Sequence, residues 1–265
     1  MPERVPKRSK AKLVDMAADE TRDAILRGRL VLWQPRRGYR FNVDSLLLAD
    51  FVAQVVGARL GRVVDLCAGV GVIGLALAVH DASADVTLVE LQERVAAFAL
   101  RNVLDNQLAA RARVVKADLG DARGMRAAIG GARFDLVVSS PPFFRLADGP
   151  PVPDAEEAIA RHELRLTLAD VVRESRRLLV PGGRAAYVYP TERLVELLAL
   201  LDGAGLRPVR LQAIHARASD PAERVLVLAQ KRTRAISRGG LAIDPPLIVR
   251  DESGYTPAAR RALGE

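Results

Sequence analysis

Strand-like and helix-like segments alternate from about residue 43 to residue 230, and this alternation constrains the fold more than any other feature. The apolar strand cores, such as Val63-Val64, Val86–Val89 and Leu136–Val138, lack the polar–apolar alternation of a sheet with one wet face. Helices should therefore cover both faces of the sheet. Short links between the segments favour right-handed crossovers, so the chain predicts an open, doubly wound, mostly parallel α/β sheet.

The hydrophobic periodicity and the turn residues set the expected elements. Helices are predicted at residues 42–56, 72–80, 92–105, 124–129 and 168–179, and from an N-cap at Thr191 to about residue 201. Strands are predicted at residues 62–66, 85–89, 112–116, 134–138, 184–189, 208–215 and 222–230. The last two, linked by residues 217–221, should form an antiparallel hairpin, residues 241–249 are a candidate edge strand, and the remainder should be a tail.

One domain is expected at residues 30–235, after a basic tail and lead-in at 1–29 and before an extension at 236–265. The net charge of +8 favours a polyanionic partner, although only five of the 40 basic residues are lysines, and an arginine-rich composition alone could produce the charge. We find neither an apolar stretch that could span a membrane nor a secretory signal. Cys67 has no cysteine to pair with, and the three histidines are scattered. These features predict a cytoplasmic protein without a metal site.

A glycine-rich loop follows the first predicted strand of the sheet. Gly69, Gly71 and Gly74 have the spacing GxGxxG, which by itself also fits a dinucleotide-binding fold. Asp65, four residues before Gly69, distinguishes the two ligands because its carboxylate would repel a pyrophosphate and attract an ammonium group. The loop therefore favours S-adenosylmethionine, which carries an ammonium group and has no diphosphate.

Two more acids, Glu90 and Asp118, end the next two strands. The carboxyl ends of parallel strands form the ligand crevice in such sheets, where Glu90 could accept the ribose hydroxyls and Asp118 the adenine amine. Each acid alone could equally be a helix cap or a surface residue. Neighbouring residues complete the predicted cofactor site: Cys67, Ala68, Leu91, Ala117, Leu119 and Ser139. We interpret Cys67 as a packing residue.

The fourth strand ends in Ser140-Pro141-Pro142-Phe143. The two prolines make this loop rigid. An amine on an aromatic ring is a poor nucleophile, and acceptors aimed at its N–H groups favour the reactive, pyramidal form. Ser140 Oγ and the Pro141 carbonyl are the candidate acceptors, and Phe143 could stack on the target base. The alternative is a plain strand terminator with core phenylalanines.

With these motifs in place, the chain resembles class I methyltransferases that carry an [Asn/Asp/Ser]-Pro-Pro-aromatic loop. The blocks GYRFNVDSLLLA (38–49), RHE (161–163) and SDPAERVLV (219–227) further resemble the bacterial tRNA(Val) adenine-N6 methyltransferase family, over roughly residues 30–260. That family methylates the adenosine beside the anticodon. One departure is that Ser140 stands where the family usually has asparagine.

The resemblance implies a Rossmann-like, seven-stranded sheet with an antiparallel last strand, S-adenosylmethionine over the glycine loop, and tRNA as the partner. It also implies that the region around Asp44 closes over the methionine end of the cofactor, through Tyr39, Arg40, Phe41, Asn42 and Asp44. Basic residues of the chain would then contact the RNA backbone or, as an equal alternative, belong to solvated tails: Lys7, Arg8, Lys10, Lys12, Lys231, Arg232 and Arg234.

Other interpretations remain open at this stage. The same fold and loop could methylate glutamine-N5 in a protein, guanine-N2 in RNA or cytosine-N4. A catalytically silent RNA-binding module would also keep the fold. An NAD-dependent oxidoreductase is disfavoured by Asp65.

Overall fold

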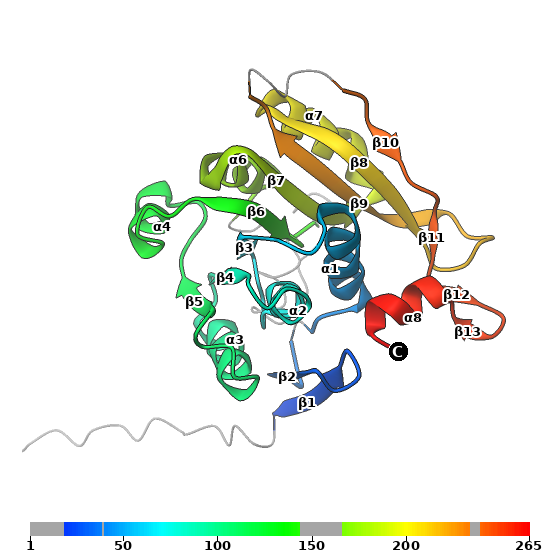
Figure 1. The fold of residues 1–265 in the computed structure, drawn as a ribbon, viewed down its shortest axis with the longest axis horizontal. Helices are drawn as coiled ribbons and strands as arrows, with labels where there is room; N and C mark the ends of the chain where they lie inside the picture. Colours follow the sequence, from blue (N-terminus) through cyan, green and yellow to red (C-terminus); the bar gives the residue numbers. More distant parts are fainter. Residues whose placement is uncertain (1–18, 39, 144–165, 234–238) are drawn as a thin grey trace, which may run out of the picture.

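A nine-stranded sheet forms the centre of the computed structural model, which describes residues 19–38, 40–143, 166–233 and 239–265 (Figure 1). The strand order is β10-β8-β9-β7-β6-β3-β4-β5, and β11 also pairs with β8. The strands are β3 (Arg62–Leu66), β4 (Asp85–Glu90), β5 (Ala112–Lys116), β6 (Phe134–Ser139), β7 (Leu179–Pro190), β8 (Leu206–His215), β9 (Ala222–Lys231), β10 (Ala242–Ile243) and β11 (Leu247–Ile248).

The seven strands expected from the sequence are β3 to β9, and the predicted fold class is confirmed. In the spatial order β5-β4-β3-β6-β7, each strand pairs in parallel with the next. The strand β9 lies between β7 and β8 and is antiparallel to both. The short strands β10 and β11 run parallel to β8 along its outer edge, so the candidate edge strand at 241–249 is also confirmed. The strand expected to start at residue 184 in fact starts earlier, because β7 begins at Leu179.

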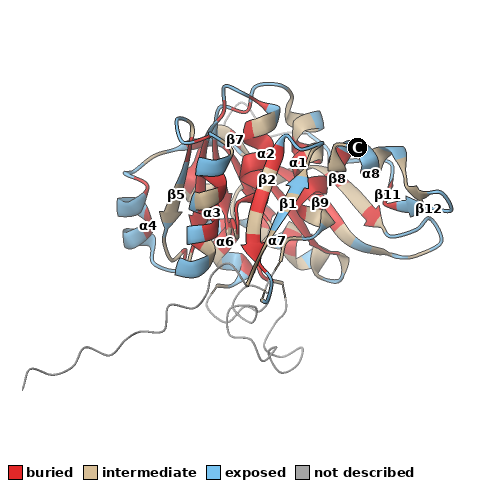
Figure 2. Ribbon diagram, turned by 90° about the horizontal axis from the view of Figure 1, so that it is seen from below, coloured by how far each residue is buried: buried red, intermediate tan, exposed pale blue. Residues whose placement is uncertain are grey.

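Helices cover both faces of the sheet. One face carries α1 (Val43–Val56), α2 (Val72–His80) and α3 (Glu93–Asp105), and the other carries α4 (Ala122–Ala128), α6 (Leu168–Leu178) and α7 (Leu194–Gly203). Adjacent strand residues belong to opposite layers: Val63 packs in the first core cluster and Val64 in the second. Figure 2 shows the buried residues concentrated in the central strands and the inner sides of these helices. Two buried faces explain the missing alternation.

The N-cap expected at Thr191 is wrong. Residues Thr191–Arg193 form the 3₁₀ turn η3, and α7 begins only at Leu194. The Thr191 hydroxyl instead donates a 2.6 Å hydrogen bond to the Ala222 carbonyl at the start of β9. Thr191 therefore connects the two strand ends rather than capping the helix.

A hairpin of β1 (Glu20–Ile25) and β2 (Leu30–Pro35), which was not expected from the sequence, lies at the start of the described chain. The boundary expected between residues 29 and 30 falls inside this hairpin. On the side of β2 away from β1, two asparagine side chains of α3 bind the main chain. Asn102 hydrogen-bonds to the backbone N–H and C=O of Trp33, and Asn106 hydrogen-bonds to those of Val31. Side chains therefore take the place of a neighbouring strand.

The chain ends in a second small hairpin, β12 (Arg250–Asp251) and β13 (Gly254–Tyr255), and the helix α8 (Pro257–Leu263). The expected tail is thus wrong in this region. Thr256 caps α8 and Pro257 occupies its first turn, a favourable start for a helix. Ala259 and Ala262 are buried in the first core cluster, and Arg261 pairs with Asp50 of α1.

Candidate active site at the carboxyl edge of the sheet

The three glycines of the loop after β3 play different roles. A Cβ on Gly74 would collide with Leu88, and one on Gly71 would lie 2.8 Å from the same side chain. These two glycines therefore let α2 pack closely against β4. Gly69 has φ +57°, and a Cβ there would meet no atom within 4 Å. Of the three, Gly69 is the one that leaves room for a ligand to approach the backbone.

Asp65 lies beneath the loop and is completely buried. Its Oδ2 accepts a 2.9 Å hydrogen bond from the Gly74 amide, while its Oδ1 is buried without a hydrogen-bond partner within the described chain. Burial raises the pKa of Asp65 to about 7, and the nearby Glu90 carboxylate adds to the rise. Asp65 therefore carries one oxygen that could still accept a donor.

Glu90 at the end of β4 fixes the other side of the loop. Its Oε2 accepts from the Gly69 amide and its Oε1 from the Gln92 amide, both at 2.9 Å. Burial raises the pKa of Glu90, and these hydrogen bonds oppose the rise. Asp118 follows β5 and accepts a 2.8 Å hydrogen bond from the Gly120 amide. The two acids thus stand side by side at the carboxyl ends of neighbouring strands, as predicted.

A cavity opens between these acids, the glycine loop and the loop after β6. Predicted site residues on its wall are Phe41, Cys67, Ala68, Gly69, Glu90, Leu91, Ala117, Asp118, Leu119, Ser140 and Pro142. The structure therefore brings the predicted cofactor loop and the predicted catalytic loop to one cavity. The sequence reading missed Pro35, Ser45, Val70, Val72, Ile73, Val89, Gln92, Val95 and Leu166. The positions of two of these residues could have indicated them. Ser45 lies one helical turn after Asn42, and Val95 lies in the first turn of the helix after Glu90. Nothing in the sequence indicated Pro35.

Other predicted site residues lie near the cavity without lining it in the described chain. Asn42 caps α1 by accepting from the Asp44 amide, and Gly71 is the N-cap of α2. Ser139 is buried and donates a 2.7 Å hydrogen bond to the Leu66 carbonyl, which ties β6 to β3. The remaining ones are Arg40, Asp44, Asp65, Pro141 and Phe143. Tyr39, the RHE block and the predicted RNA contacts Lys7, Arg8, Lys10, Lys12 and Arg234 lie outside the described residues.

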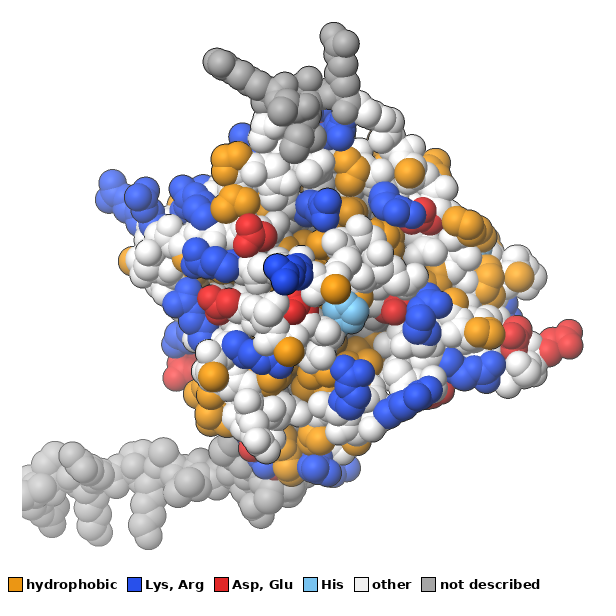
Figure 3. Space-filling model, viewed as in Figure 1, with side chains coloured by type: hydrophobic (Ala, Val, Ile, Leu, Met, Phe, Trp, Pro, Cys, Tyr) orange, Lys and Arg blue, Asp and Glu red, His pale blue; other side chains and the backbone are white. Residues whose placement is uncertain are grey.

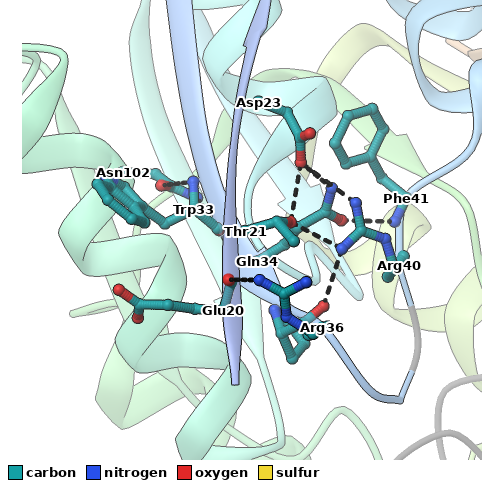
Figure 4. A network of polar contacts seen from close by, with 10 residues as sticks. Glu20, Thr21, Asp23, Trp33, Gln34, Arg36, Arg40, Phe41 and Asn102 are labelled. Carbon is teal, nitrogen blue, oxygen red and sulfur yellow. Dashed lines mark hydrogen bonds and ion pairs between the residues drawn. The ribbon is translucent and has the colours of Figure 1, made fainter. Parts of the chain in front are cut away.

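Arg40 points toward the β1–β2 hairpin (Figure 4). Its guanidinium donates to Thr21 Oγ1 at 2.7 Å and to the Pro35 carbonyl at 3.2 Å, and it pairs with Asp23. The buried Gln34 accepts from the Phe41 amide. This network holds the segment that places Phe41 on the cavity wall, so Arg40 acts on the site from outside.

Two arginines contact Phe143, the last residue of the Ser-Pro-Pro-Phe loop. Arg193 Nη1 donates a 2.8 Å hydrogen bond to the Phe143 carbonyl. The guanidinium carbon of Arg224 lies 4.9 Å from the centre of the Phe143 ring. Pro141 and Pro142 are buried. The loop is therefore held by the burial of its two prolines and by the contacts of two arginines with Phe143.

Cys67 lies at the end of β3 with φ +59°. Burial raises the pKa of its thiol above the ordinary value, with smaller contributions from Glu90 and Asp65. A neutral thiol is a poor nucleophile, which agrees with a packing role. In the residues that the structure describes, no group of three or more His, Cys, Asp or Glu side chains could hold a metal ion. Among the described helices, none has the length and apolar character needed to traverse a bilayer.

A doubly wound sheet with this glycine loop, these acids and a rigid Ser-Pro-Pro-Phe loop on one cavity defines a Rossmann-like methyltransferase. The chain belongs to the methyltransferase small domain family, whose model matches residues 42–196, more than half of its length. The predicted class, an S-adenosylmethionine-dependent methyltransferase, is confirmed.

Named relatives agree with this assignment. The chain is 30% identical over 209 residues to the tRNA1(Val) (adenine(37)-N6)-methyltransferase of Aeromonas hydrophila, covering 78% of this chain and 84% of that protein. It is 27% identical over 199 residues to the protein of the same name from Parabacteroides distasonis, covering 75% and 80%. Among solved structures, it is similar to one described as a predicted O-methyltransferase from Agrobacterium tumefaciens, with a TM-score of 0.63, 28% identity and coverage of 83% and 94%.

Proposed function

We propose that this protein transfers a methyl group from S-adenosylmethionine to the N6 amine of an adenine in tRNA. The observation that carries the proposal is that Ser140 and Pro142 share one cavity wall with Gly69 and Glu90. The loop proposed to bind the amine thus lies beside the loop proposed to bind the cofactor. The relatives named tRNA1(Val) (adenine(37)-N6)-methyltransferase support adenine as the base and tRNA as the partner.

The residues at and beneath the cavity fit the cofactor in four respects. Each Glu90 oxygen already accepts one backbone amide and has capacity left for the ribose hydroxyls. Asp118 lies one strand further, where it can accept the adenine amine, between the apolar residues Leu119 and Ala117. The open space above Gly69 lets the adenosine approach the backbone. The unpaired Oδ1 of Asp65 could receive the ammonium group, directly or through water.

When bound, S-adenosylmethionine supplies an electrophilic methyl group on its sulfonium. The protein's part is to hold the target amine in line with that group and to favour its pyramidal form. We assign this to Ser140 Oγ and the Pro141 carbonyl as acceptors of the amine N–H groups, with proline rigidity keeping them aimed. Phe143 would stack on the base. Transfer is direct, with no covalent enzyme intermediate.

A tRNA substrate and the unpaired Cys67 also agree with a cytoplasmic location.

Basic residues of β9 and its extension, including Lys231 and Arg232, remain candidate contacts for the RNA backbone. Their charge is partly used within the protein, because Lys231 donates to the Leu179 carbonyl and Arg232 pairs with Asp202.

Incubation of the protein with radiolabelled S-adenosylmethionine and total RNA, followed by nucleoside analysis, tests the proposal. We expect label in N6-methyladenosine from the tRNA fraction. Label in methylguanosine, methylcytidine or a protein glutamine would instead support an alternative substrate, and no transfer would support a silent RNA-binding module.

Ser140→Ala should lower turnover by about 10²-fold or more, as removal of a hydrogen-bonding group that stabilises a transition state typically does. Phe143→Ala should lower it by about 5- to 150-fold, because it removes a stacking contact worth about 1–3 kcal/mol. Calorimetry should show unchanged cofactor affinity in both variants. Ser219→Ala, an exposed serine in the β8–β9 link, is the matched control and should keep full turnover. Normal turnover in both loop variants would remove the proposed role of this loop.

A further inference from the structure

The antiparallel strand β9 brings its first residues, rather than its last, to the active-site edge of the sheet. Parallel strands bring their carboxyl ends to this edge, whereas an antiparallel strand brings its amino end. Arg224 stands near the start of β9, opposite Pro190 at the end of β7. Because side chains alternate along a strand, Arg224 shares a face with Leu226 and Leu228, which pack in the core cluster of α1.

From this position Arg224 connects α1 with the catalytic loop. Its Nε lies 3.4 Å from Asp44 Oδ2, and both side chains are largely buried, with 26% and 16% exposed. Its guanidinium also covers the Phe143 ring, 4.9 Å from the ring centre. Asp44 lies in α1 one residue before Ser45, which lines the cofactor cavity. The cavity wall and the aromatic ring are therefore joined through one side chain.

The Phe143 main chain has an independent anchor. Arg193 binds the Phe143 carbonyl and is itself held by Glu196, with two hydrogen bonds of 2.9 Å. The ring packs partly against the second core cluster. With the main chain held by Arg193, the ring can change its orientation by side-chain rotation, and Arg224 restricts this rotation from the α1 side.

We propose that Arg224 is a positioning residue that fixes the Phe143 ring in the orientation that receives the target base. The inference rests on the proposed function, because it assumes that a flat base meets this ring. A planar guanidinium can cover an aromatic face and pair with a carboxylate at the same time, whereas the ammonium of lysine matches only the second task well. Arg224 acts through Phe143 and Asp44 and need not touch the methyl group.

Steady-state kinetics with tRNA test this role in R224A, R224K and the control R217A. Arg217 is exposed in the link between β8 and β9, so its removal changes the net charge equally. We expect R224A to lower kcat at least tenfold with less than a twofold change in cofactor affinity, R224K to recover only part of the loss, and R217A to stay within twofold. An equal loss of kcat in R224A and R217A would show that only the net charge of the protein matters, and it would overturn the inference.

A rise in kcat/KM for R224A would also overturn it, because Arg224 would then be blocking the base. A fluorine NMR measurement without RNA tests the ring contact directly. In protein labelled with fluorinated phenylalanine, the Phe143 resonance is assigned with F143L. This resonance should shift in R224A and stay in place in R217A. An unmoved resonance in R224A would contradict the ring contact. Absence of RNA methylation by the wild type would contradict the proposed function and the role in base binding with it, whereas normal RNA methylation by R224A would contradict this inference alone.

Discussion

Among single residues, Asp65 combines complete burial with incomplete hydrogen bonding. A buried carboxylate without full compensation destabilises the fold, and the protein responds by shifting the pKa of the group upward. The oxygen left unpaired lies beneath the loop that is proposed to bind a positively charged cofactor. Asp65 is therefore a place where stability is given up at a functional site.

The pH dependence of stability should show this cost. With a pKa of 3.8 unfolded and about 7 folded, the native state binds more protons between these values, so Asp65 lowers stability progressively as pH rises from about 4 to 7. Asp65→Asn, which can still accept from Gly74, should therefore be more stable than the wild type at pH 8, by at most about 4 kcal/mol, and by less than half of that at pH 5.

Urea unfolding of both proteins at pH 5 and pH 8 measures the difference. The same variant should bind S-adenosylmethionine more weakly, because the carboxylate that would attract the ammonium group is gone. A stability difference independent of pH would show that Asp65 does not titrate in this range.

Among the elements, the β1–β2 hairpin depends on α3 for its place in the fold. Asn102 is fully buried and makes three hydrogen bonds: it accepts from the Trp33 amide and donates to the carbonyls of Trp33 and Val70. Val70 belongs to the glycine loop. One amide therefore fixes the hairpin to α3 and to the cofactor loop together.

Asn102→Ala should cost about 3 kcal/mol or more, because it leaves buried backbone groups without partners. Asn106→Ala is the matched control, since Asn106 also bonds both polar groups of a hairpin residue, Val31, but is only partly buried and water can replace it. Chemical denaturation gives both values. Equal losses would show that burial of the amide does not set its contribution.

The sequence predicted elements well where apolar periodicity was strong. The bounds of β3, α2 and β5 match the predicted ranges, because each is an apolar run with a clear start and stop. It missed β1, whose residues ETRDAI alternate weakly and whose partner strand β2 is held by amides some 70 positions away. It also missed α8, a short helix whose apolar side is two alanines.

The same division holds for the site. The acids and the loop after β6 were predictable because parallel strands place their carboxyl ends together. The contact of Arg224 with Phe143 was not, since it depends on β9 lying between β7 and β8. The resemblance assigned Arg40 to the cofactor site. Its hydrogen-bond partners are instead Thr21, Asp23 and Pro35, in a hairpin that was not expected from the sequence.

On the scale of the whole molecule, the net charge of +8 does not locate a binding surface. Figure 3 shows Lys and Arg side chains spread over one face among acidic and apolar groups. Many arginines are paired, for example Arg94 with Asp19, Arg101 with Glu20 and Arg210 with Asp244. The charge of each of these arginines is therefore neutralised locally by its carboxylate partner.

The two ends of the described chain also meet. The Leu26 amide donates to the Leu263 carbonyl at 3.2 Å, and a Cβ on Gly264 would lie 2.5 Å from Leu26 Cα. Gly264→Ala should therefore destabilise the protein by about 1–3 kcal/mol more than Gly28→Ala. Gly28 is the matched control because its φ of +78° resembles the +74° of Gly264, yet its Cβ would meet nothing within 4 Å. Equal melting temperatures of the two variants would contradict this docking.

This junction between first and last elements has a consequence during synthesis. The hairpin at residues 20–35 is synthesised early, whereas the backbone that receives the Leu26 amide follows more than 200 residues later. The turn of the nascent hairpin therefore has no docking partner there until α8 has been made. Synthesis of α8, rather than completion of the sheet, is then the step that allows this turn to dock.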